Sequence, residues 1–320
     1  MHIQRICILG GTGFVGRHIA NRLGNQAVSV RVLTRNRERQ RDLLVIPNLE
    51  LVEADVHDPE VLRKHFTEAD CVINLIGILN DSSRTGRGFE RAHVELPRKI
   101  IESCRATGVY RLLHMSALGA AADAPSQYQR SKAQGEQLVL AANDAELATT
   151  CFRPSVIFGP GDSFFSRFAG LLKWAPGFFP LPTPNARFSP VFVGDVADAF
   201  VRSLEESDTF GRAIDLCGPR TYTLRELVQY TAQVSHHQRR IIGLSDRLSR
   251  LQARILGRLP GQPYSYDNYL SATRDNVGSC DGLQQLGITP TAVEAVVPSY
   301  LSSFGARRRY DLFRKGARRV

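Results

Sequence analysis

The sequence predicts a doubly wound α/β fold, in which helices cover both faces of a parallel sheet, with a smaller, mainly helical region toward the C-terminus. Two patterns in the 320-residue chain carry this prediction. Up to about residue 155, short apolar runs alternate with segments whose apolar residues recur at helical spacing, which is typical of βαβ units. A glycine-rich segment follows the first apolar run directly, which indicates a tight turn into a helix. The ligand crevice of such a sheet lies at the carboxyl ends of its strands.

The predicted strands and helices alternate through the first half of the chain. Strands are expected over 4–9, 28–34, 49–53, 70–76, 110–115 and 147–153, and helices near 14–24, 58–66, 88–107 and 126–143. The next stretch is rich in proline and phenylalanine, which indicates an insertion, and a helix over about 195–206 and a strand over 213–217 then resume the α/β pattern. We therefore predict a sheet domain of 1–158 and 190–218, a second domain of 159–189 and 219–306, and a basic tail of 307–320. The second domain includes an amphipathic run with Leu244, Leu248, Leu251, Ile255 and Leu259 on roughly one face.

The positive charge of the chain is concentrated at its C-terminal end. The net charge is +10, and residues 307–320 hold seven basic side chains against the single acid Asp311. This distribution argues against a specific nucleic-acid footprint and for a local basic appendage. That tail is either solvated charge or a peripheral contact with a membrane or another binding surface.

Cysteine usage and hydropathy indicate the compartment. The six cysteines (Cys7, Cys71, Cys104, Cys151, Cys217 and Cys280) form no CxxC pair, so we interpret them as reduced, buried small hydrophobes and expect no metal site. The N-terminus lacks the pattern of a signal peptide, and no eighteen apolar residues run without interruption. We expect a cytoplasmic protein that does not span a membrane, with peripheral attachment at the inner membrane surface as an open alternative.

The segment from Gly10 to Gly16 has the spacing and context of a dinucleotide-binding turn. Gly10 permits the tight turn, Gly13 lets backbone amides approach a pyrophosphate at the helix N-terminus, and Gly16 allows close packing of helix on strand. Proteins of this Rossmann type that bind NAD place a carboxylate at the end of the second strand, where this chain has Arg35 instead. Because a guanidinium can pair with a 2′-phosphate, the sequence predicts NADP(H) as cofactor; the alternative is an ordinary exposed arginine.

Two further segments fall where the sheet would flank a bound dinucleotide. Asp55 and Val56 follow the third strand, and Leu75, Ile76 and Gly77 follow the fourth. We expect the first pair beside the adenine and the second group beside the nicotinamide ribose.

Three residues form a candidate catalytic group. Tyr128 and Lys132 are four positions apart on a predicted helix, so their side chains project from one face, and Ser116 ends the fifth strand at the rim of the crevice. A nearby ammonium favours the phenolate, so we expect Lys132 to lower the pKa of Tyr128. Together these groups would polarise a carbonyl during hydride transfer to or from nicotinamide. The Tyr–Lys spacing is weak evidence alone, and its position after the rim serine strengthens it.

These motifs, with the segments 153–162 and 193–197, resemble those of an extended or atypical short-chain dehydrogenase/reductase of the NAD-dependent epimerase/dehydratase kind, over about residues 3–305. The segments 116–120, 287–291 and 294–296 further resemble bacterial relatives of the nucleotide-binding accessory subunit of respiratory complex I. The family resemblance implies Tyr128 as acid/base, Lys132 as its pKa-lowering and ribose-binding partner, and Ser116 as the polarising hydroxyl. It also implies that Thr12, Phe14, Val15 and Pro154 belong to the cofactor site.

Two departures from the family pattern bear on function. His93 stands where many active members have asparagine, which puts the proton relay behind Lys132 in doubt. The segment 164–188 holds six phenylalanines and the only tryptophan, Trp174, which fits an apolar substrate such as a quinone or isoprenoid precursor, an apolar docking face, or simple core packing.

Two functions therefore compete. The first is an NADP(H)-dependent oxidoreductase, or an isomerase with a tightly held cofactor, that acts on a hydrophobic carbonyl or alcohol. The second is a non-catalytic NADP(H)-binding accessory or assembly factor of a respiratory or quinone-synthesising complex at the membrane. The intact set of Ser116, Tyr128 and Lys132 favours turnover, whereas His93, the apolar insertion and the basic tail favour the accessory role. The sequence does not indicate the substrate, the direction of reaction or the oligomeric state.

Overall fold

The structure, a computed structural model, describes residues 2–81, 85–259, 264–278 and 281–302. Cys280 and the basic tail 307–320 lie outside these residues. Within them, seven parallel strands form one sheet in the order β11-β6-β5-β4-β1-β2-β3. From one edge to the other these are β11 (Arg212–Leu216), β6 (Ala148–Pro154), β5 (Arg111–Met115), β4 (Cys71–Asn74), β1 (Arg5–Leu9), β2 (Ser29–Thr34) and β3 (Leu49–Glu53). The predicted parallel sheet is confirmed, and its strand order reverses direction at β1 and β4, where such sheets bind ligands.

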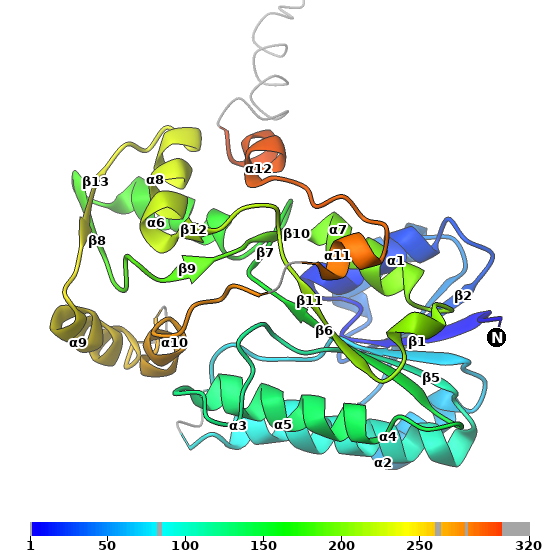
Figure 1. Cartoon of the computed structure of the whole chain (residues 1–320). Coiled ribbons are helices and arrows are strands. Elements are labelled where there is room, and N and C mark those ends of the chain that lie inside the picture. Colours follow the sequence, from blue (N-terminus) through cyan, green and yellow to red (C-terminus); the bar gives the residue numbers. More distant parts are fainter. Residues whose placement is uncertain (1, 82–84, 260–263, 279–280, 303–320) are drawn as a thin grey trace, which may run out of the picture.

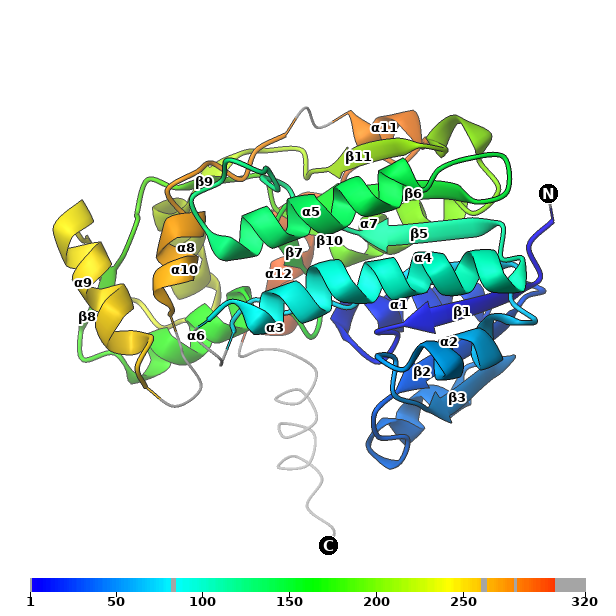
Figure 2. The same ribbon diagram turned by 90° about the horizontal axis from the view of Figure 1, so that it is seen from below.

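Helices cover both faces of the sheet because its central strands are apolar on both sides (Figure 1). In β1, Ile6 and Ile8 pack into one core cluster and Cys7 and Leu9 into the other. Figure 2 shows the face that carries α2 (Pro59–Phe66), α4 (Leu96–Thr107) and α5 (Gln127–Ala141). The opposite face carries α1 (Phe14–Leu23), α7 (Val193–Arg202) and α11 (Gly282–Gln285). Short 3-10 turns, η1 (Glu38–Val45) and η3 (Ser207–Thr209), follow β2 and α7.

The segment 88–107, predicted as one helix, is divided into three helical pieces in the structure. It consists of α3 (Arg87–Glu90), a π-helical stretch η2 (Arg91–Glu95) and α4. Pro97 has no N–H to donate to the carbonyl of His93 four residues earlier, which gives a physical reason for the interruption. That carbonyl lies so close to α5 that a Cβ on Gly135 would be 1.9 Å from it, so only glycine fits there. This close approach holds η2 against the helix that carries Tyr128 and Lys132.

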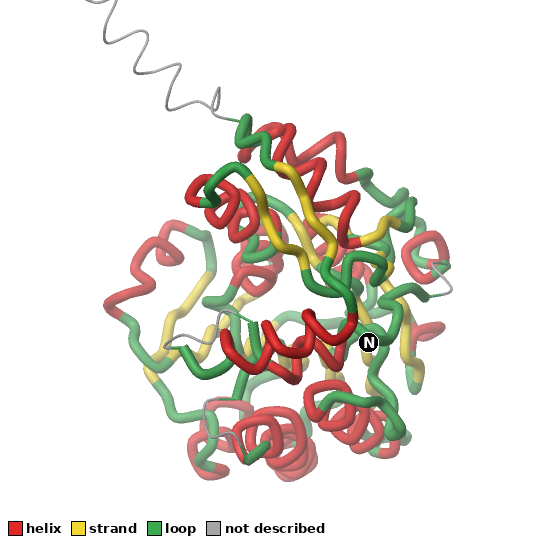
Figure 3. Tube along the Cα trace, turned by 90° about the vertical axis from the view of Figure 1, so that its left-hand side faces the viewer, coloured by secondary structure: helices red, strands yellow, loops and turns green. Residues whose placement is uncertain are grey.

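The smaller region beside the sheet is mixed rather than purely helical. Its helices are α6 (Phe165–Trp174), α8 (Leu224–Val234), α9 (Asp246–Leu256), α10 (Tyr266–Ser271) and α12 (Val293–Leu301). Its strands form three two-stranded pairs: β7 (Ile157–Phe158) with β10 (Val191–Phe192), β8 (Phe178–Leu181) with β13 (Arg240–Gly243), and β9 (Arg187–Phe188) with β12 (Tyr222–Thr223). Figure 3 shows this region from the side on which α9 and the β8–β13 pair lie.

Side-chain hydrogen bonds join the sheet domain to the smaller region. The carboxylate of Asp195 on α7 accepts hydrogen bonds from the backbone N–H of Thr291 at 2.7 Å and from its hydroxyl at 2.9 Å. The side chain of Asn276 donates to the carbonyl of Leu118 at 2.9 Å and accepts from the Ser155 hydroxyl at 2.6 Å. These bonds hold the smaller region over the carboxyl ends of the strands.

Two further properties follow from the described residues. The five cysteines among them are buried and form no disulfide with one another, as predicted for reduced small hydrophobes. No helix in this part of the chain combines the length and the hydropathy that crossing a bilayer requires.

Candidate functional site

The glycine turn between β1 and α1 is packed so closely that side chains would not fit. Gly10 has a φ of +80°, and a Cβ there would lie 3.1 Å from the carbonyl carbon of Leu75. A Cβ on Gly16 would lie 2.5 Å from the carbonyl oxygen of Gly10. The turn therefore brings the N-terminus of α1 against the end of β4, as the sequence pattern predicts.

The N-terminus of α1 has the character of an anion site. Gly13 is the N-cap and has no side chain to accept a hydrogen bond from the backbone N–H groups of the first turn, which include those of Phe14 and Val15. The Thr12 carbonyl accepts from the Nε atom of Arg17 at 3.0 Å, which fixes the turn from its outer side. A glycine cradle that leads into uncapped helix amides fits a pyrophosphate.

The ends of β2 and β3 carry the groups predicted to lie beside the adenine. Arg35 follows β2 directly and is exposed, whereas Val56 is buried. The carboxylate of Asp55 accepts from the backbone N–H of His57 at 2.9 Å. Sequence reasoning missed a carboxylate here: Glu53, the register partner of Thr34, accepts from the backbone N–H of Arg37 at 3.0 Å.

Buried polar side chains shape the loop that follows β4. The Asn74 side-chain oxygen accepts from the Ile76 N–H at 3.1 Å. The Asn74 Nδ2 group lies 3.1 Å from Nδ1 of His114, and because an amide NH2 can only donate, Nδ1 of His114 accepts. At the next turn, a Cβ on Gly77 would lie 3.0 Å from Nζ of Lys132. The structure thus brings the predicted Leu75–Gly77 segment beside the predicted catalytic lysine.

Two of the catalytic candidates, Ser116 and Lys132, lie at the carboxyl end of β5, and Tyr128 is on α5 with Lys132. Lys132 is buried, and its Nζ donates to the carbonyl of Met115 at 3.0 Å, directly before Ser116. The Ser116 hydroxyl is buried and has no hydrogen-bond partner within the described residues. Pro154 ends β6, and its carbonyl accepts from the Leu118 N–H at 3.0 Å. An unsatisfied buried hydroxyl costs free energy unless a ligand completes it, which is typical of a binding position.

The expected effect of Lys132 on Tyr128 was wrong for this structure. Burial, and secondarily the charge of Asp267, raise the pKa of Tyr128 to about 12. Burial also lowers the pKa of Lys132 to about 8. At neutral pH the phenol is therefore protonated, and Lys132 still carries its charge.

His93 stands where many active members of the family have asparagine, and its contacts in the structure give it a different role. Its Nε2 accepts from the Ile78 N–H at 3.1 Å, so its Nδ1 carries the proton and donates to the Ser131 hydroxyl at 2.8 Å. Burial, with the charge of Lys132, lowers its pKa to about 2. The ring also lies edge-on to Tyr128, with 5.6 Å between centroids. The neutral His93 ring thus links the loop after β4 to α5 by hydrogen bonds.

Asp267 is a site residue that sequence reasoning missed. Its two carboxylate oxygens accept from the backbone N–H groups of Gln127 at 2.7 Å and Tyr128 at 3.1 Å, at the N-terminus of α5. This contact joins α10 of the smaller region to the catalytic helix across 139 positions of sequence. No local pattern could indicate a partner at that separation.

The phenylalanines of the insertion mostly form a core. Phe164, Phe165, Phe168, Phe179 and Phe188 belong to two apolar clusters with α8 and α12 and pack edge-on or tilted against one another. Core packing therefore accounts for five of the six, and they do not support an apolar substrate pocket. Phe178 and Trp174 are exposed.

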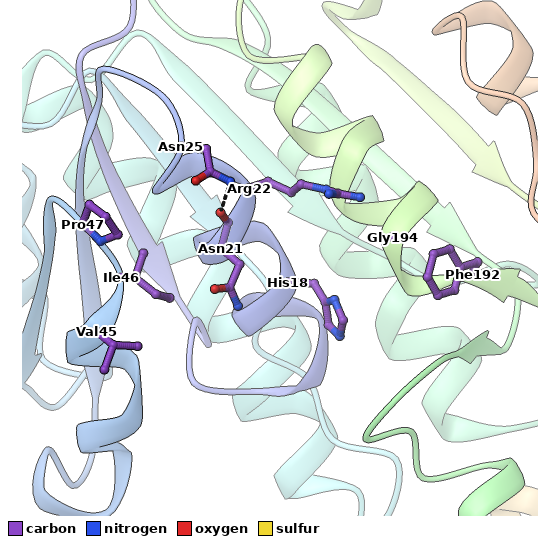
Figure 4. A pocket seen from close by; sticks show the side chains of 9 residues that line it. All are labelled: His18, Asn21, Arg22, Asn25, Val45, Ile46, Pro47, Phe192 and Gly194. Atoms are coloured by element: carbon purple, nitrogen blue, oxygen red, sulfur yellow. Dashed lines mark hydrogen bonds between the residues drawn. The ribbon is translucent and has the colours of Figure 1, made fainter. Parts of the chain in front are cut away.

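A surface pocket of about 300 Å³ lies elsewhere, on the outer side of α1 (Figure 4). Its lining includes His18, Arg22, Ile46 and Phe192, and none of the catalytic candidates. We do not assign the cofactor or the substrate to it.

Comparison with known proteins agrees with the glycine turn and the sheet order. A model described as the NAD dependent epimerase/dehydratase family matches residues 6–217. The chain belongs to this family. The family assignment confirms the resemblance to extended short-chain dehydrogenases/reductases and the expectation of a dinucleotide cofactor of the NAD(P) type.

Relatives within and around this family differ in what they do. The chain is 29% identical, over 96% of its length and 80% of the relative, to mouse (Mus musculus) NADH dehydrogenase (ubiquinone) 1 alpha subcomplex subunit 9, mitochondrial. It is 31% identical, over 75% of its length and 74% of the relative, to the ceramide reductase of Caulobacter vibrioides. The fold is similar to that of a dTDP-glucose 4,6-dehydratase double mutant from Streptomyces venezuelae solved with NAD, with a TM-score of 0.74 and 19% identity over 98% of both chains.

Proposed function

We propose that the chain is an NADP(H)-dependent oxidoreductase that reduces an apolar carbonyl substrate, with Tyr128 as the proton donor. The observation that carries this proposal is a set of three groups at the end of β5 and on α5 suited to that chemistry. It consists of a buried hydroxyl without a partner on Ser116, a protonated phenol on Tyr128 and a buried ammonium on Lys132. A cofactor-binding protein without chemistry needs no such set, and each buried charge costs stability.

The protonation states favour reduction. A phenol with a pKa of about 12 is protonated at neutral pH, so it is ready to give a proton and poorly suited to take one. When bound, NADPH would supply the hydride to the carbonyl carbon. Tyr128 would give its proton to the carbonyl oxygen, and the Ser116 hydroxyl would donate a hydrogen bond to the same oxygen. Lys132, whose Nζ lies beside Gly77, would bind the nicotinamide ribose of the cofactor.

The cofactor site would be built from residues already in place. The cradle from Gly10 to Gly16 would hold the pyrophosphate, and Arg35 would pair with the 2′-phosphate that distinguishes NADP(H) from NAD(H). Support for NADP(H) comes from the exposure of Arg35 and from Glu53, whose carboxylate already holds the backbone of Arg37.

The apolar character of the substrate rests on the loop beside Lys132. Ile76 and Ile78 flank Gly77, and the next residue, Leu79, is 60% exposed. The similarity to a ceramide reductase supports a lipid-like carbonyl compound as the substrate class.

The test compares Tyr128→Phe with Tyr110→Phe, which alters a tyrosine whose hydroxyl donates to the backbone of His2, outside the site. Each chain is mixed with NADPH and a series of methyl ketones of increasing chain length, and NADPH consumption is followed. Tyr128→Phe should bind NADPH like the wild type and lose turnover by about 100-fold or more, whereas Tyr110→Phe should match the wild type. Equal turnover by Tyr128→Phe would contradict the assignment.

A second function has its own support. The similarity to the mouse complex I subunit covers 96% of the chain, and the neutral His93 ring is a structural link rather than a proton relay. A non-catalytic accessory protein would bind NADPH, gain thermal stability from it and show no ketone-dependent consumption. That combination of results would replace the first proposal with the second.

A further inference from the structure

An apolar surface lies on the side of the smaller region farthest from the sheet. Helix α9 exposes Leu248, Leu251 and Ile255 to about half, and Leu259 just after the helix is 47% exposed. These residues recur at helical spacing and form one continuous stripe. We call this stripe the α9 face. Figures 1 and 2 both show α9 at the outer edge of the molecule.

The neighbouring strand pair exposes two further apolar side chains. In the parallel pairing of β8 with β13, Phe178 is the partner of Arg240, and Ile242 lies two residues farther along. Because side chains alternate across a strand, these three share the outer side, and Phe178 and Ile242 are 49% and 43% exposed. Their neighbours Phe179 and Ile241 pack into the core on the inner side.

The opposite side of α9 attaches the helix firmly. Ser249 and Ala253 are buried, and the Ser249 hydroxyl accepts from the Thr183 N–H at 3.1 Å. The Tyr269 hydroxyl bonds to Asp246 in the first turn. The helix is thus held in the fold by its small and polar residues, which leaves its large aliphatic residues directed outward.

A row of arginines borders the α9 face. At helical spacing, Arg247, Arg254 and Arg258 fall in the sector next to Leu251, and Arg250 continues that sector. All four are exposed, and Arg250, at the far end of this sector, is ion-paired with Asp246, the acid of α9. A helix with large aliphatic residues outward and a cationic border has the composition of interfacial helices, which lie in the plane of a lipid surface.

We propose that the α9 face docks the protein onto an anionic lipid surface, with the leucines and Ile255 entering the headgroup boundary and the arginines contacting the headgroups. The charge on this side decides between occupants. The tail 307–320 is itself strongly basic, so like charge opposes its folding back onto the arginine border. A second copy would bring the same arginines into contact with one another. An anionic bilayer satisfies both the apolar stripe and its border.

The experiment uses the full chain with vesicles of phosphatidylcholine and vesicles of phosphatidylcholine mixed with phosphatidylglycerol. The test variant is Leu251→Gln with Ile255→Gln, both 53% exposed. The matched control is Leu44→Gln with Val45→Gln, which removes two exposed aliphatic residues from η1 on the sheet domain. All chains keep the tail, so its charge contributes equally to each.

We expect the wild type to co-sediment with the anionic vesicles more than with the neutral ones. The α9 variant should lose about tenfold or more of this affinity, while the η1 control stays within about twofold of the wild type. Equal melting temperatures and NADPH affinities of the three chains show that they are folded. A second variant, Arg254→Gln with Arg258→Gln, should bind anionic vesicles more weakly than the wild type, and its binding should depend less on salt concentration.

Three results would overturn the proposal. One is binding of the α9 variant at wild-type strength, and another is absence of wild-type binding to anionic vesicles. The third is a wild-type dimer, seen by sedimentation velocity without lipid, that the α9 variant converts to a monomer, since this would show that a second copy covers the face. These outcomes are independent of ketone turnover at Tyr128.

Discussion

Replacing Lys132 with methionine should stabilise the protein. Burial lowers the pKa of Lys132 from its ordinary 10.5 to about 8, so the folded state disfavours the charged form. At about 1.4 kcal/mol per pH unit, this shift corresponds to a penalty of about 3 kcal/mol at neutral pH. Methionine fills a similar volume without charge and gives up the hydrogen bond from the ammonium to the Met115 carbonyl, which is worth about 2 kcal/mol. The net expectation is a gain of about 1 kcal/mol in the free energy of unfolding.

The stability difference between Lys132→Met and the wild type should depend on pH. Below pH 8, Lys132 is charged in both the folded and the unfolded chain, and the full penalty applies. Between pH 8 and 10.5 the folded state releases its proton first, so the stability of the wild type rises relative to that of the variant. The advantage of Lys132→Met should therefore be largest at pH 7 and be lost near pH 10, where the penalty has fallen to below about 1 kcal/mol.

Urea unfolding of both chains at pH 7 and pH 10 measures this difference. Lys64→Met, at an exposed lysine on α2, is the control and should change stability by no more than about 0.5 kcal/mol at either pH. A Lys132→Met chain that is less stable than the wild type at pH 7 would refute the reasoning. So would an advantage that does not change with pH, because the buried charge would then not be its cause.

Three further predictions concern single positions. Arg35→Ala should weaken NADPH binding by about tenfold or more and leave NADH binding nearly unchanged, as measured by calorimetric titration; equal losses for both cofactors would remove Arg35 from the 2′-phosphate site. Gly16→Ala should cost about 2 kcal/mol or more of unfolding free energy, because its Cβ would lie 2.5 Å from the Gly10 carbonyl oxygen, and Gly170→Ala, whose Cβ meets open space, should cost far less. Asp267→Asn should lower the pKa of Tyr128 from about 12 by removing a nearby negative charge, which ultraviolet difference titration against the Tyr128→Phe chain can detect; an unchanged pKa would leave burial as its sole cause.

The fold could be predicted from the sequence because its signals are local. Most predicted strands of the sheet are short apolar runs, and the turn at Gly10 requires a positive φ and a close approach that only glycine allows. Tyr128 and Lys132 share a helix, so their common face follows from spacing alone. The interruption of the 88–107 helix has a local cause in Pro97, which stands in the middle of that span, so the sequence did carry a signal against one continuous helix.

The rest of the site depends on tertiary contacts. Asp267 caps the catalytic helix from another region, Glu53 reaches the backbone of Arg37 from a neighbouring strand, and the raised pKa of Tyr128 follows from burial. Periodicity marked α9 as amphipathic but could not tell that its aliphatic stripe faces outward. In the same way, the phenylalanines of the insertion gave no indication of whether they line a cavity or fill a core.

The central claim, that Ser116, Tyr128 and Lys132 form a working site for carbonyl reduction, is tested most directly by following the hydride itself. The wild type and Tyr128→Phe are each incubated with NADPH deuterated at the transferable position of nicotinamide and with a long-chain methyl ketone, and the product alcohol is analysed by mass spectrometry. The account predicts deuterium on the carbinol carbon with the wild type and almost none with Tyr128→Phe. Absence of labelled alcohol from a wild-type chain that binds NADPH, or equal label from both chains, would contradict it.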